Sequence, residues 1–391
     1  MGDRHHDAGL AVDGSGHAVV VVAPDKFKGS LTAVQVARAV AAGILTQRPD
    51  IVLRCLPIAD GGEGTLEAAE AAGFQRVLVE APGPTGEPVS AAYARRGITA
   101  VLELAEVVGS RRLPEGRPEP LDSSTYGLGV LVLHALEAGC QRLILAVGSS
   151  ASTDGGAGLL QALGARLLDA DGCDLPRGGG ALASLASIDL AGLHPLAARV
   201  DLVVAHDVDN PLLGPSGAAA AYGPQKGATA ADIDLLETGL VRWADLVAAA
   251  TGRDVSGGPG AGAAGGTAFA AFAVLGARSQ PGVELVLDLL RFREAVTGAT
   301  LVVTGEGSLD PQSLHGKAPI GAARQAASAG VPVVAVAGRC LLSPTELAHV
   351  GIRAAYPLSA LEADPARSIS NAATLLERIG GRIAKEQLSG A

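Results

Sequence analysis

Five glycine-bearing loops constrain the fold of this 391-residue chain more than any other feature. They read P-D-K-F-K-G-S, A-D-G-G-E-G-T, V-G-S-S-A-S-T-D-G-G-A-G, S-G-G-P-G-A-G-A-A-G-G-T and T-G-E-G-S-L-D-P-Q-S-L-H-G-K-A-P. An apolar strand or helix approaches each loop, and a helical pattern follows it. Such alternation is typical of α/β layers with a mainly parallel sheet. Because ligands bind at the carboxyl ends of parallel strands, the sequence predicts an α/β protein whose loops gather around a ligand.

The strand candidates are short apolar runs bounded by turn residues. They cover residues 17–23, 51–58, 142–147, 200–205, 300–304 and 331–337. The first helical pattern follows a cap at Ser30 or Thr32. The second ends at a glycine stop, Gly73.

The length of the chain predicts about two domains. The turn-rich segment 81–88 suggests one boundary near residue 80, and we place the other near residue 290. On this prediction residues 17–80 and 290–391 form one domain, and residues 81–289 form a domain inserted into it. Residues 1–16 are expected to be a flexible tail, since they contain three aspartates and no apolar core of a signal peptide.

Charge and cysteine content exclude several classes of protein. The net charge of -10 argues against a nucleic acid or an anionic membrane held by a broad basic surface. No apolar run approaches the ~20 residues of a membrane span. The four cysteines are far apart and form no C-x-x-C pair, so neither a zinc cage nor a disulfide framework is indicated. A cytoplasmic location fits this composition.

Lysine is scarce and unevenly placed. Only five of the 30 basic residues are lysines, and four of them, Lys26, Lys28, Lys226 and Lys317, lie in glycine-bearing loops. The H-G-K-A-P segment around Lys317 is not a nucleotide-binding P-loop, because Ala318 stands where the hydroxyl residue for magnesium is required. Lys317 can still act as a point charge on a phosphate.

Two of the glycine loops permit more than one interpretation. Residues 146–158 offer small hydroxyl groups and backbone N–H groups at a helix start, where anions bind, but Thr153 or Asp154 could simply cap that helix. Gly260, Gly262 and Gly265 satisfy G-x-G-x-x-G, yet the preceding segment is polar and contains proline, so a dinucleotide fold is not indicated. Close helix packing explains these glycines equally well.

Carboxylates are concentrated in the same loops. Such hard oxygen ligands suit Mg²⁺, which takes one or two carboxylates together with substrate phosphates. Several of them are expected to serve only turns or caps. The candidates are Asp25, Asp60, Glu63, Asp154, Asp207, Asp209, Glu306 and Asp310.

The combined motifs resemble those of the bacterial glycerate kinases. The blocks that carry the resemblance run in family order from about Val19 to near the C-terminus: A-P-D-K-F-K-G-S-L, P-I-A-D-G-G-E-G-T, V-G-S-S-A-S-T-D-G-G-A-G, G-P-Q-K-G-A, G-A-G-A-A-G-G and V-T-G-E-G-S-L-D-x-Q-S-L-H-G-K-A-P-I-G. The resemblance implies transfer of phosphate from ATP to D-glycerate with Mg²⁺, most members giving 2-phosphoglycerate. It also implies two α/β domains with the active site in the cleft between them, one domain being flavodoxin-like and built from both chain ends.

This resemblance leads to specific roles as hypotheses. Lys26, Lys28 and Lys317 would contact the transferring phosphoryl group or the glycerate carboxylate. Asp60 and Asp207 would orient or deprotonate the substrate hydroxyl, and Glu306 and Asp310 would lie near magnesium. Backbone N–H groups would hold phosphates at Gly148, Ser149, Ser150, Thr153, Asp154, Gly155, Gly156, Gly260, Gly262, Gly265 and Gly266.

Alternatives to this function remain open from the sequence. The nearest are glycerate 3-phosphorylation and a related small hydroxy-acid kinase. A metabolite-sensing protein would use the same loops without turnover, but no DNA-reading module with a basic face is visible. An NAD-dependent oxidoreductase would need a ribose-binding acid, for which only Glu284 is loosely placed. The oligomeric state and the ligand held by each loop are not predicted.

Overall fold

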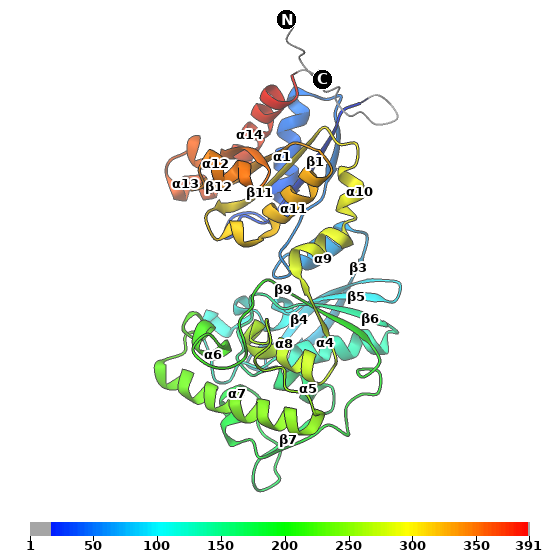
Figure 1. Ribbon diagram of the computed structural model, residues 1–391, viewed down its shortest axis with the longest axis vertical. Helices are drawn as coiled ribbons and strands as arrows, with labels where there is room; N and C mark the ends of the chain where they lie inside the picture. Colours follow the sequence, from blue (N-terminus) through cyan, green and yellow to red (C-terminus); the bar gives the residue numbers. More distant parts are fainter. Residues whose placement is uncertain (1–16, 390–391) are drawn as a thin grey trace, which may run out of the picture. The chain divides into compact units, whose positions relative to one another are not determined.

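The computed structural model describes residues 17–389, so the tail expected at residues 1–16 lies outside the described residues. The chain divides into two compact units. Residues up to Ala59 together with those from Val286 form the first, here called the terminal unit (Figure 1). Asp60–Leu285 form the second, the central unit. The second edge, at 285/286, lies close to the expected position near 290, whereas the first, at 59/60, lies about 20 residues before the expected position near 80.

The terminal unit contains a five-stranded parallel sheet built from both ends of the chain. Its strands lie in the order β13 (Ile352–Pro357), β12 (Val333–Cys340), β11 (Leu301–Leu309), β1 (Val19–Pro24) and β2 (Val52–Cys55). Numbered within the unit and taken from the other edge, this order is 2-1-3-4-5, that of the flavodoxin-like fold. The prediction of a flavodoxin-like sheet assembled from both chain ends is therefore confirmed.

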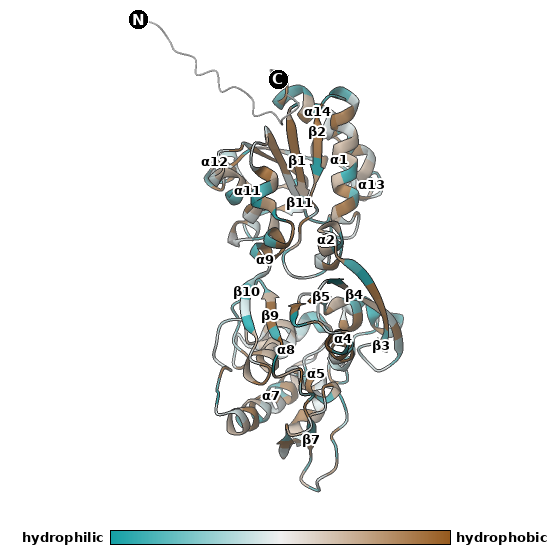
Figure 2. Ribbon diagram, turned by 90° about the vertical axis from the view of Figure 1, so that its right-hand side faces the viewer, coloured by the Kyte–Doolittle hydropathy of each residue, from teal (hydrophilic) through white to brown (hydrophobic). Residues whose placement is uncertain are grey.

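Helices cover both faces of this sheet, as Figure 2 shows. Alternate valines of β1, including Val20 and Val22, pack with α1 (Ala33–Gln47) and α14 (Ala372–Gln387) in one apolar core. Burying each such side chain contributes about 1.5–3 kcal/mol. On the other face α11 (Ala318–Ser328) packs against β1, β11 and β12. The remaining helices of the unit are α10 (Phe292–Val296), α12 (Pro344–His349) and α13 (Pro365–Ser370), while α9 (Gly282–Leu289) spans the second edge.

The first helix begins at one of the two caps expected from the sequence. The Thr32 side chain accepts a hydrogen bond from the backbone N–H of Gln35, and the Gln35 side chain accepts one from the N–H of Thr32. This reciprocal capping box satisfies two N–H groups that a helix start otherwise leaves unpaired. Ser30 instead donates to the carbonyl of Ile369, which ties the loop before α1 to α13.

Glycines allow α1 and α14 to approach closely. A Cβ atom on Gly43 would lie 1.9 Å from the carbonyl oxygen of Glu377, and one on Gly380 would lie 2.2 Å from that of Val40. Neither distance is sterically possible, so any larger residue would force the helices apart. The neighbouring Gly381 is different, because its nearest contact would be an ordinary 3.5 Å to Gln47.

The central unit contains a mixed six-stranded sheet. Its order is β10 (Arg278–Pro281), β9 (Asp201–His206), β6 (Arg142–Ala146), β5 (Thr99–Glu103), β4 (Pro88–Arg96) and β3 (Gln75–Pro82). The first four are parallel, whereas β3 and β4 form an antiparallel hairpin that adds to β5. Segment 81–88, interpreted above as a break between domains, contains the turn of this hairpin, closed by a 2.7 Å bond from Gly83 N–H to the Glu87 carbonyl. The edge consequently falls before β3.

Leucine, alanine and valine fill the core of the central unit, together with a few aromatic rings such as Trp243 and Phe269. Its helices are α2 (Thr65–Ala71), α3 (Ala105–Val108), α4 (Tyr126–Glu137), α5 (Ala157–Ala162), α6 (Ala218–Tyr222), α7 (Ala230–Thr251) and α8 (Ala263–Ala273). A small antiparallel pair, β7 (Arg166–Leu168) and β8 (Ser187–Asp189), completes the unit.

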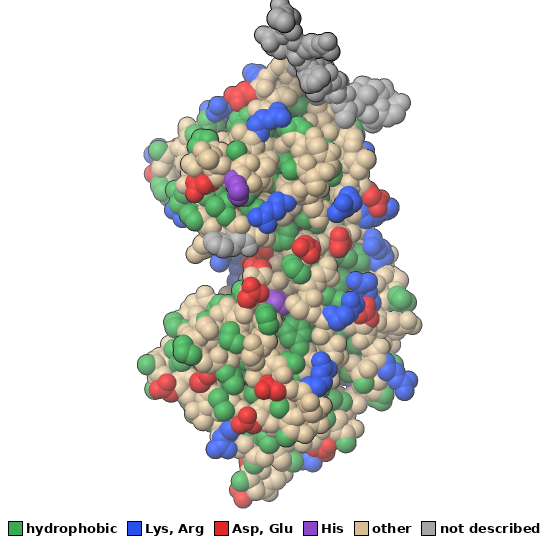
Figure 3. Space-filling view, viewed as in Figure 1, with side chains coloured by type: hydrophobic (Ala, Val, Ile, Leu, Met, Phe, Trp, Pro, Cys, Tyr) green, Lys and Arg blue, Asp and Glu red, His purple; other side chains and the backbone are tan. Residues whose placement is uncertain are grey.

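On the described part of the face in Figure 3, basic and acidic side chains are interspersed. All four cysteines are free thiols. Within residues 17–389, none of the helices combines the length and apolarity needed to cross a membrane.

The contact between α1 and α14 gives a matched test of packing. We expect Gly380→Ala to destabilise the protein by about 1–3 kcal/mol, because the added methyl group meets a backbone carbonyl. Gly381→Ala should be neutral or stabilising by up to ~1 kcal/mol, since alanine favours helix and finds space there. Thermal denaturation followed by circular dichroism measures both. Equal midpoints for the two variants would contradict the packing described.

Candidate active site

In the terminal unit the candidate site lies where β1 and β11 end side by side. Connections leave these adjacent strands toward opposite edges of the sheet, and ligands of open α/β sheets bind at such a switch point. Two hydrogen bonds fix the ends of the strands together. The backbone N–H of Asp25 donates to the Gly305 carbonyl at 2.7 Å, and the Thr304 hydroxyl donates to the Ala23 carbonyl at 2.8 Å.

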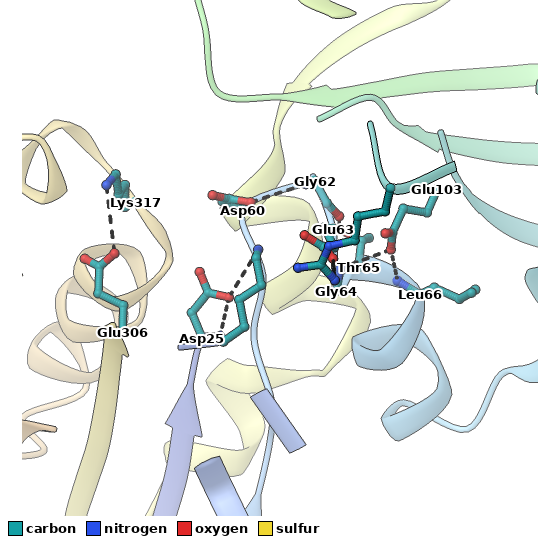
Figure 4. Close-up of polar contacts among 12 residues, drawn as sticks. Asp25, Asp60, Gly62, Glu63, Gly64, Thr65, Leu66, Glu103, Glu306 and Lys317 are labelled. Atoms are coloured by element: carbon teal, nitrogen blue, oxygen red, sulfur yellow. Dashed lines mark hydrogen bonds and ion pairs between the residues drawn. The ribbon is translucent and has the colours of Figure 1, made fainter. Parts of the chain in front are cut away.

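Two acid–lysine pairs lie at the ends of these strands, Asp25 with Lys26 and Glu306 with Lys317; Figure 4 labels Asp25, Glu306 and Lys317. Asp25 and Glu306 are only 7% and 8% exposed. The Lys26 ammonium lies 3.9 Å from an Asp25 oxygen, and the Lys317 ammonium lies 3.9 Å from a Glu306 oxygen. The sequence analysis named all four residues, three of them with roles, and the fold brings them together within one unit.

The loop that carries Lys26 and Lys28 is a tight turn held by its own backbone. Phe27 and Leu31 exchange N–H to carbonyl bonds of 2.8 and 3.0 Å, and the buried Phe27 ring joins the core of the unit. Gly29 takes φ +79° at the turn, which leaves Lys28 exposed at its tip. The loop also lies against β11, because a Cβ on Gly307 would be 3.4 Å from the backbone nitrogen of Lys28.

Asp310 has a visible structural role in the next turn. One of its carboxylate oxygens accepts a 3.0 Å bond from Gln312 N–H, and the other accepts a 3.3 Å bond from the Ser308 hydroxyl. Lys317 stands at the cap position of α11. Among the described residues, no group of three or more His, Cys, Asp or Glu side chains is arranged to hold a metal ion. Glu306 and Asp310 nevertheless offer the one or two carboxylates that Mg²⁺ uses alongside phosphates.

Three segments of the central unit pack backbone against backbone, and each follows a parallel strand. They are the A-D-G-G-E-G loop after β2, the Gly148 loop after β6 and the segment after β10. A Cβ on Gly61 would lie 2.7 Å from the Cα of Gly282, which follows β10. A Cβ on Gly148, which follows β6, would lie 2.6 Å from the Cα of Gly62. Glycine is needed here because only a bare backbone permits such approach. The A-D-G-G-E-G loop is thereby fixed beside the start of the Gly148 loop.

The Glu103 carboxylate binds backbone N–H groups of the A-D-G-G-E-G loop and of the helix that follows it. The sequence analysis missed this residue. It ends β5, is 3% exposed, and accepts bonds of 3.1 and 3.0 Å from the N–H groups of Gly64 and Leu66 (Figure 4). The negative charge of this carboxylate also interacts favourably with the positive, N-terminal end of the α2 dipole. Asp60 is half-buried in the same loop, where its Oδ1 accepts a 3.3 Å bond from Gly62 N–H.

The tip of the Gly148 loop has a strained backbone. Ser149 adopts φ +62°, a left-handed conformation that non-glycine residues rarely take, and it is exposed. Ser150 pairs with Gly109, and its hydroxyl lies 2.9 Å from that of Ser152. Two residues after Gly109, Arg111 forms an ion pair of 2.6 Å with Glu63 of the neighbouring loop. Strain of this kind gathers at functional positions.

Asp154 is fully buried and acts as a cap. Its carboxylate accepts bonds from Thr125 N–H and hydroxyl at 2.7 and 2.8 Å, and from the N–H groups of Gly156 and Gly158 at 3.2 Å each. Ser124 adds a further bond at 3.3 Å. The N-cap residue of α5 is Gly156, and Asp154 serves the start of this helix through its bonds to the N–H groups of Gly156 and Gly158. A structural role for Asp154 at the helix start was one of the possibilities left open by the sequence.

The G-A-G-A-A-G-G segment packs against this loop. Three consecutive residues, Ala264 to Gly266, adopt positive φ of 52°, 66° and 87°, forming a left-handed turn within the first residues of α8. A Cβ on Gly265 would lie 2.1 Å from the Ser152 carbonyl oxygen, while the Gly265 carbonyl accepts a 2.9 Å bond from Gly155 N–H. Helix α7 and a turn precede Gly260, so the strand required for a dinucleotide site is absent there.

Many N–H groups of these two loops already bind protein atoms. Gly155 and Gly156 donate to Gly265 and Asp154, whereas Gly262 and Gly266 donate to Asn210 and Gly262. A Cβ on Gly260 would strike the His206 ring at 2.1 Å. These glycines are explained by close packing, and the prediction that their N–H groups hold phosphate stays a prediction.

The end of β9 carries His206 and Asp207. Burial lowers the pKa of His206, whose Nε2 lies 2.8 Å from the Ser279 hydroxyl. Asp207 is exposed. Burial, and then the charge of Asp207, raise the pKa of Tyr222, which donates a 2.5 Å bond to Asn210. Both candidate bases lie in segments that follow β-strands. Asp60 comes after β2, which ends at Cys55, and Asp207 comes after β9, which ends at His206.

These features define an α/β protein in which lysine- and glycine-rich loops follow parallel strands in both units. The family model "Glycerate kinase family" matches residues 20–387. The chain belongs to the glycerate kinase family, and it is a kinase.

Several similar proteins carry names that agree with this assignment. The chain is 45% identical over 342 residues to the glycerate kinase of Halalkalibacterium halodurans, covering 87% of this chain and 90% of that protein. It is 44% identical to the glycerate 2-kinase of Escherichia coli, covering 82% and 84%. A crystal structure from Salmonella typhimurium LT2, provisionally named glycerate kinase 2, has a TM-score of 0.83 at 41% identity and covers 96% and 99%.

The left-handed turn in the first residues of α8 predicts a sharp difference between two glycine substitutions. Gly265 and Gly276 both have φ of +66°, but only Gly265 has a backbone atom in the way of a Cβ. We expect Gly276→Ala to cost about 1 kcal/mol from strain alone, and Gly265→Ala to cost clearly more. The single tryptophan, Trp243, donates a 2.9 Å bond to the Gly155 carbonyl and reports on this contact. Urea unfolding, followed by the fluorescence of Trp243, measures the free energy of unfolding of both variants. Equal losses in the two variants would contradict the packing role of Gly265.

Proposed function

We propose that this kinase transfers the γ-phosphoryl group of ATP to the 2-hydroxyl group of D-glycerate, giving 2-phosphoglycerate and ADP. The observation that carries the proposal is the pairing of Lys26 and Lys317 with two buried carboxylates at the β1/β11 switch point of a glycerate kinase family member. The relative named glycerate 2-kinase, at 44% identity, supports the choice of the 2-hydroxyl. The reaction is placed in the cytoplasm, where ATP is available.

The charge of the ligands explains the lysines. ATP and glycerate are both anions, whereas the chain carries a net charge of -10. Because phosphoryl transfer depends on positioning and on stabilising charge at the transferring group, local cations are required. Lys26, Lys28 and Lys317 supply them from the two loops that end β1 and β11.

The carboxylates of the terminal unit fit Mg²⁺. Glu306 is nearly buried and offers hard oxygen ligands, and Asp310 follows at the end of the same strand. When bound, Mg²⁺ would neutralise phosphate charge and align the phosphate oxygens. The chain's own contribution is to hold the two carboxylates on β11 and to place Lys317 beside Glu306.

The central unit would supply the acceptor side of the reaction. Asp60 and Asp207 are proposed to orient the substrate hydroxyl and to accept its proton. The Gly148–Ser150 tip is proposed to bind an anionic group of glycerate or of the nucleotide. Thr153, Asp154 and the glycines at 155, 156, 260, 262, 265 and 266 would support this tip by packing. The proposal thus assigns residues of both units to one reaction.

The proposed product is tested by two assays in parallel. With ATP, Mg²⁺ and D-glycerate, ADP release should coincide with signal from enolase and pyruvate kinase when phosphoglycerate mutase is left out, because only 2-phosphoglycerate feeds enolase directly. Omitting Mg²⁺ should abolish both signals. ADP release without the enolase signal would overturn the 2-hydroxyl in favour of the 3-product. Silence in both assays would overturn D-glycerate as substrate and favour a sensor.

The role of Lys26 is tested by removing its charge. Lys26→Met should lower kcat by about 100-fold or more, as loss of one group that stabilises the transition state typically does. Lys385→Met is the matched control, since Lys385 is exposed on α14 outside the glycine loops, and its activity should stay within about twofold of the parent. Unchanged melting temperatures would show that both variants fold. Parent-like turnover of Lys26→Met would contradict the assignment.

A further inference from the structure

Lys226 reaches into the central unit toward the loop that starts at Gly148. It ends a short turn, Pro224–Lys226, just before α7. Its ammonium group donates to the Ser152 carbonyl and, at 3.3 Å, to the Thr153 hydroxyl. Since an ammonium group has three N–H donors, two of them are committed to this one loop.

The contact is relayed toward the exposed tip of the loop. The backbone N–H of Ser152 donates to the Ser150 hydroxyl at 3.1 Å, and the two hydroxyl groups lie 2.9 Å apart. Ser150 follows the strained Ser149. Lys226 therefore fixes the segment from which the tip projects, without belonging to the tip itself.

A fully buried carboxylate lies next to this contact. Asp154 follows Thr153 directly and accepts its hydrogen bonds from neutral donors, namely backbone N–H groups and hydroxyl groups. Neutral donors disperse a negative charge but do not cancel it. An anion that approached the loop would meet the field of Asp154 through a poorly screening interior. A nearby cation is needed if the loop is to bind an anion.

We propose that Lys226 is a positioning residue that holds the Gly148–Thr153 loop and offsets the charge of Asp154, so that the tip of the loop can bind an anionic ligand. This inference rests on the proposed function only for the nature of the ligand, a carboxylate or a phosphate. Lys226 acts through the loop and does not itself contact the reacting atoms.

The electrostatic environment supports this role. Burial lowers the pKa of Lys226 to about 8, although Asp154 opposes the shift. Gly227, next to Lys226, packs against Pro118, whose neighbours are Arg117, which is ion-paired with Glu115, and the exposed Glu119. On the C-terminal side of Lys226, Asp232 completes the capping box at the start of α7. Lys226 should therefore lose its proton within a pH range in which a kinase can be assayed, and the charge of Asp154 should then act on the ligand.

The test compares the parent enzyme, Lys226→Met and Lys226→Arg. ADP release is measured directly between pH 7 and pH 9.5, a range that spans the pKa of about 8 for Lys226. In the parent, KM for one anionic ligand, ATP or D-glycerate, should rise above about pH 8. In Lys226→Met that KM should be raised on the order of tenfold at every pH, with kcat changed less. In Lys226→Arg it should stay low and nearly flat, because a guanidinium group keeps its proton.

The Lys226→Arg variant separates this role from a purely structural one. An alkaline rise of KM identical in the parent and in Lys226→Arg would overturn the proposal, as would a parent-like KM in Lys226→Met. If Lys226→Met does not fold, the comparison of the parent with Lys226→Arg alone decides. Lys385→Arg controls for a general effect of arginine.

Binding measurements keep the inference distinct from the proposed reaction. Titration calorimetry with ATP and with D-glycerate, at pH 7 and pH 9.5, measures affinity without turnover. Absence of turnover in the parent would refute the proposed reaction, but weaker binding at high pH in the parent and not in Lys226→Arg would still support the role of Lys226. Affinities that do not depend on pH in either protein would overturn it.

Discussion

The parallel pairing of β1 with β11 is the contact on which the organisation of this kinase depends. Val20 pairs with Leu301 and Pro24 with Gly305, so residues about 280 positions apart become neighbours. The entropy needed to close such a long loop grows only slowly with its length, and the buried valines of both strands offset it. The central unit can therefore be inserted between β2 and β11 at modest cost.

The same pairing creates the chemistry of the terminal unit. Asp25 and Lys26 extend β1, and Glu306 lies on β11 one residue beyond Gly305, so the register of the two strands sets their separation. A one-residue slip would turn Glu306 to the opposite face of the sheet. The Asp25 N–H bond to Gly305 pins this register at the point where the ligand loops begin.

Much of this arrangement could be predicted from the sequence, for a physical reason. The six strands expected from apolar runs are all present, because buried parallel strands have continuous hydrophobic sequences. The hairpin β3–β4 was missed because its apolar runs are short, are flanked by charged residues, and are interrupted by prolines at 82 and 88 around its turn. Glu103 and Lys226 were not assigned roles because their partners are distant in sequence, which no local pattern reveals. The scarcity of lysine and the G-P-Q-K-G-A block were the two signals that marked Lys226.

Each of three loop lysines lies near an acid, and this arrangement bears on how the loops bind anions. The Lys317 ammonium lies 3.9 Å from a Glu306 oxygen, and the Lys26 ammonium lies 3.9 Å from an Asp25 oxygen. The charge of Asp154 acts on Lys226 and raises its pKa, against the lowering by burial. A charge-assisted hydrogen bond would be about 2.7–2.9 Å, so the two ion pairs balance charge without forming such a bond between those atoms. In a chain of net charge -10, an acid beside each of these lysines offsets part of its positive charge. The lysines and acids therefore form locally balanced pairs at the positions where an anionic ligand is proposed to bind.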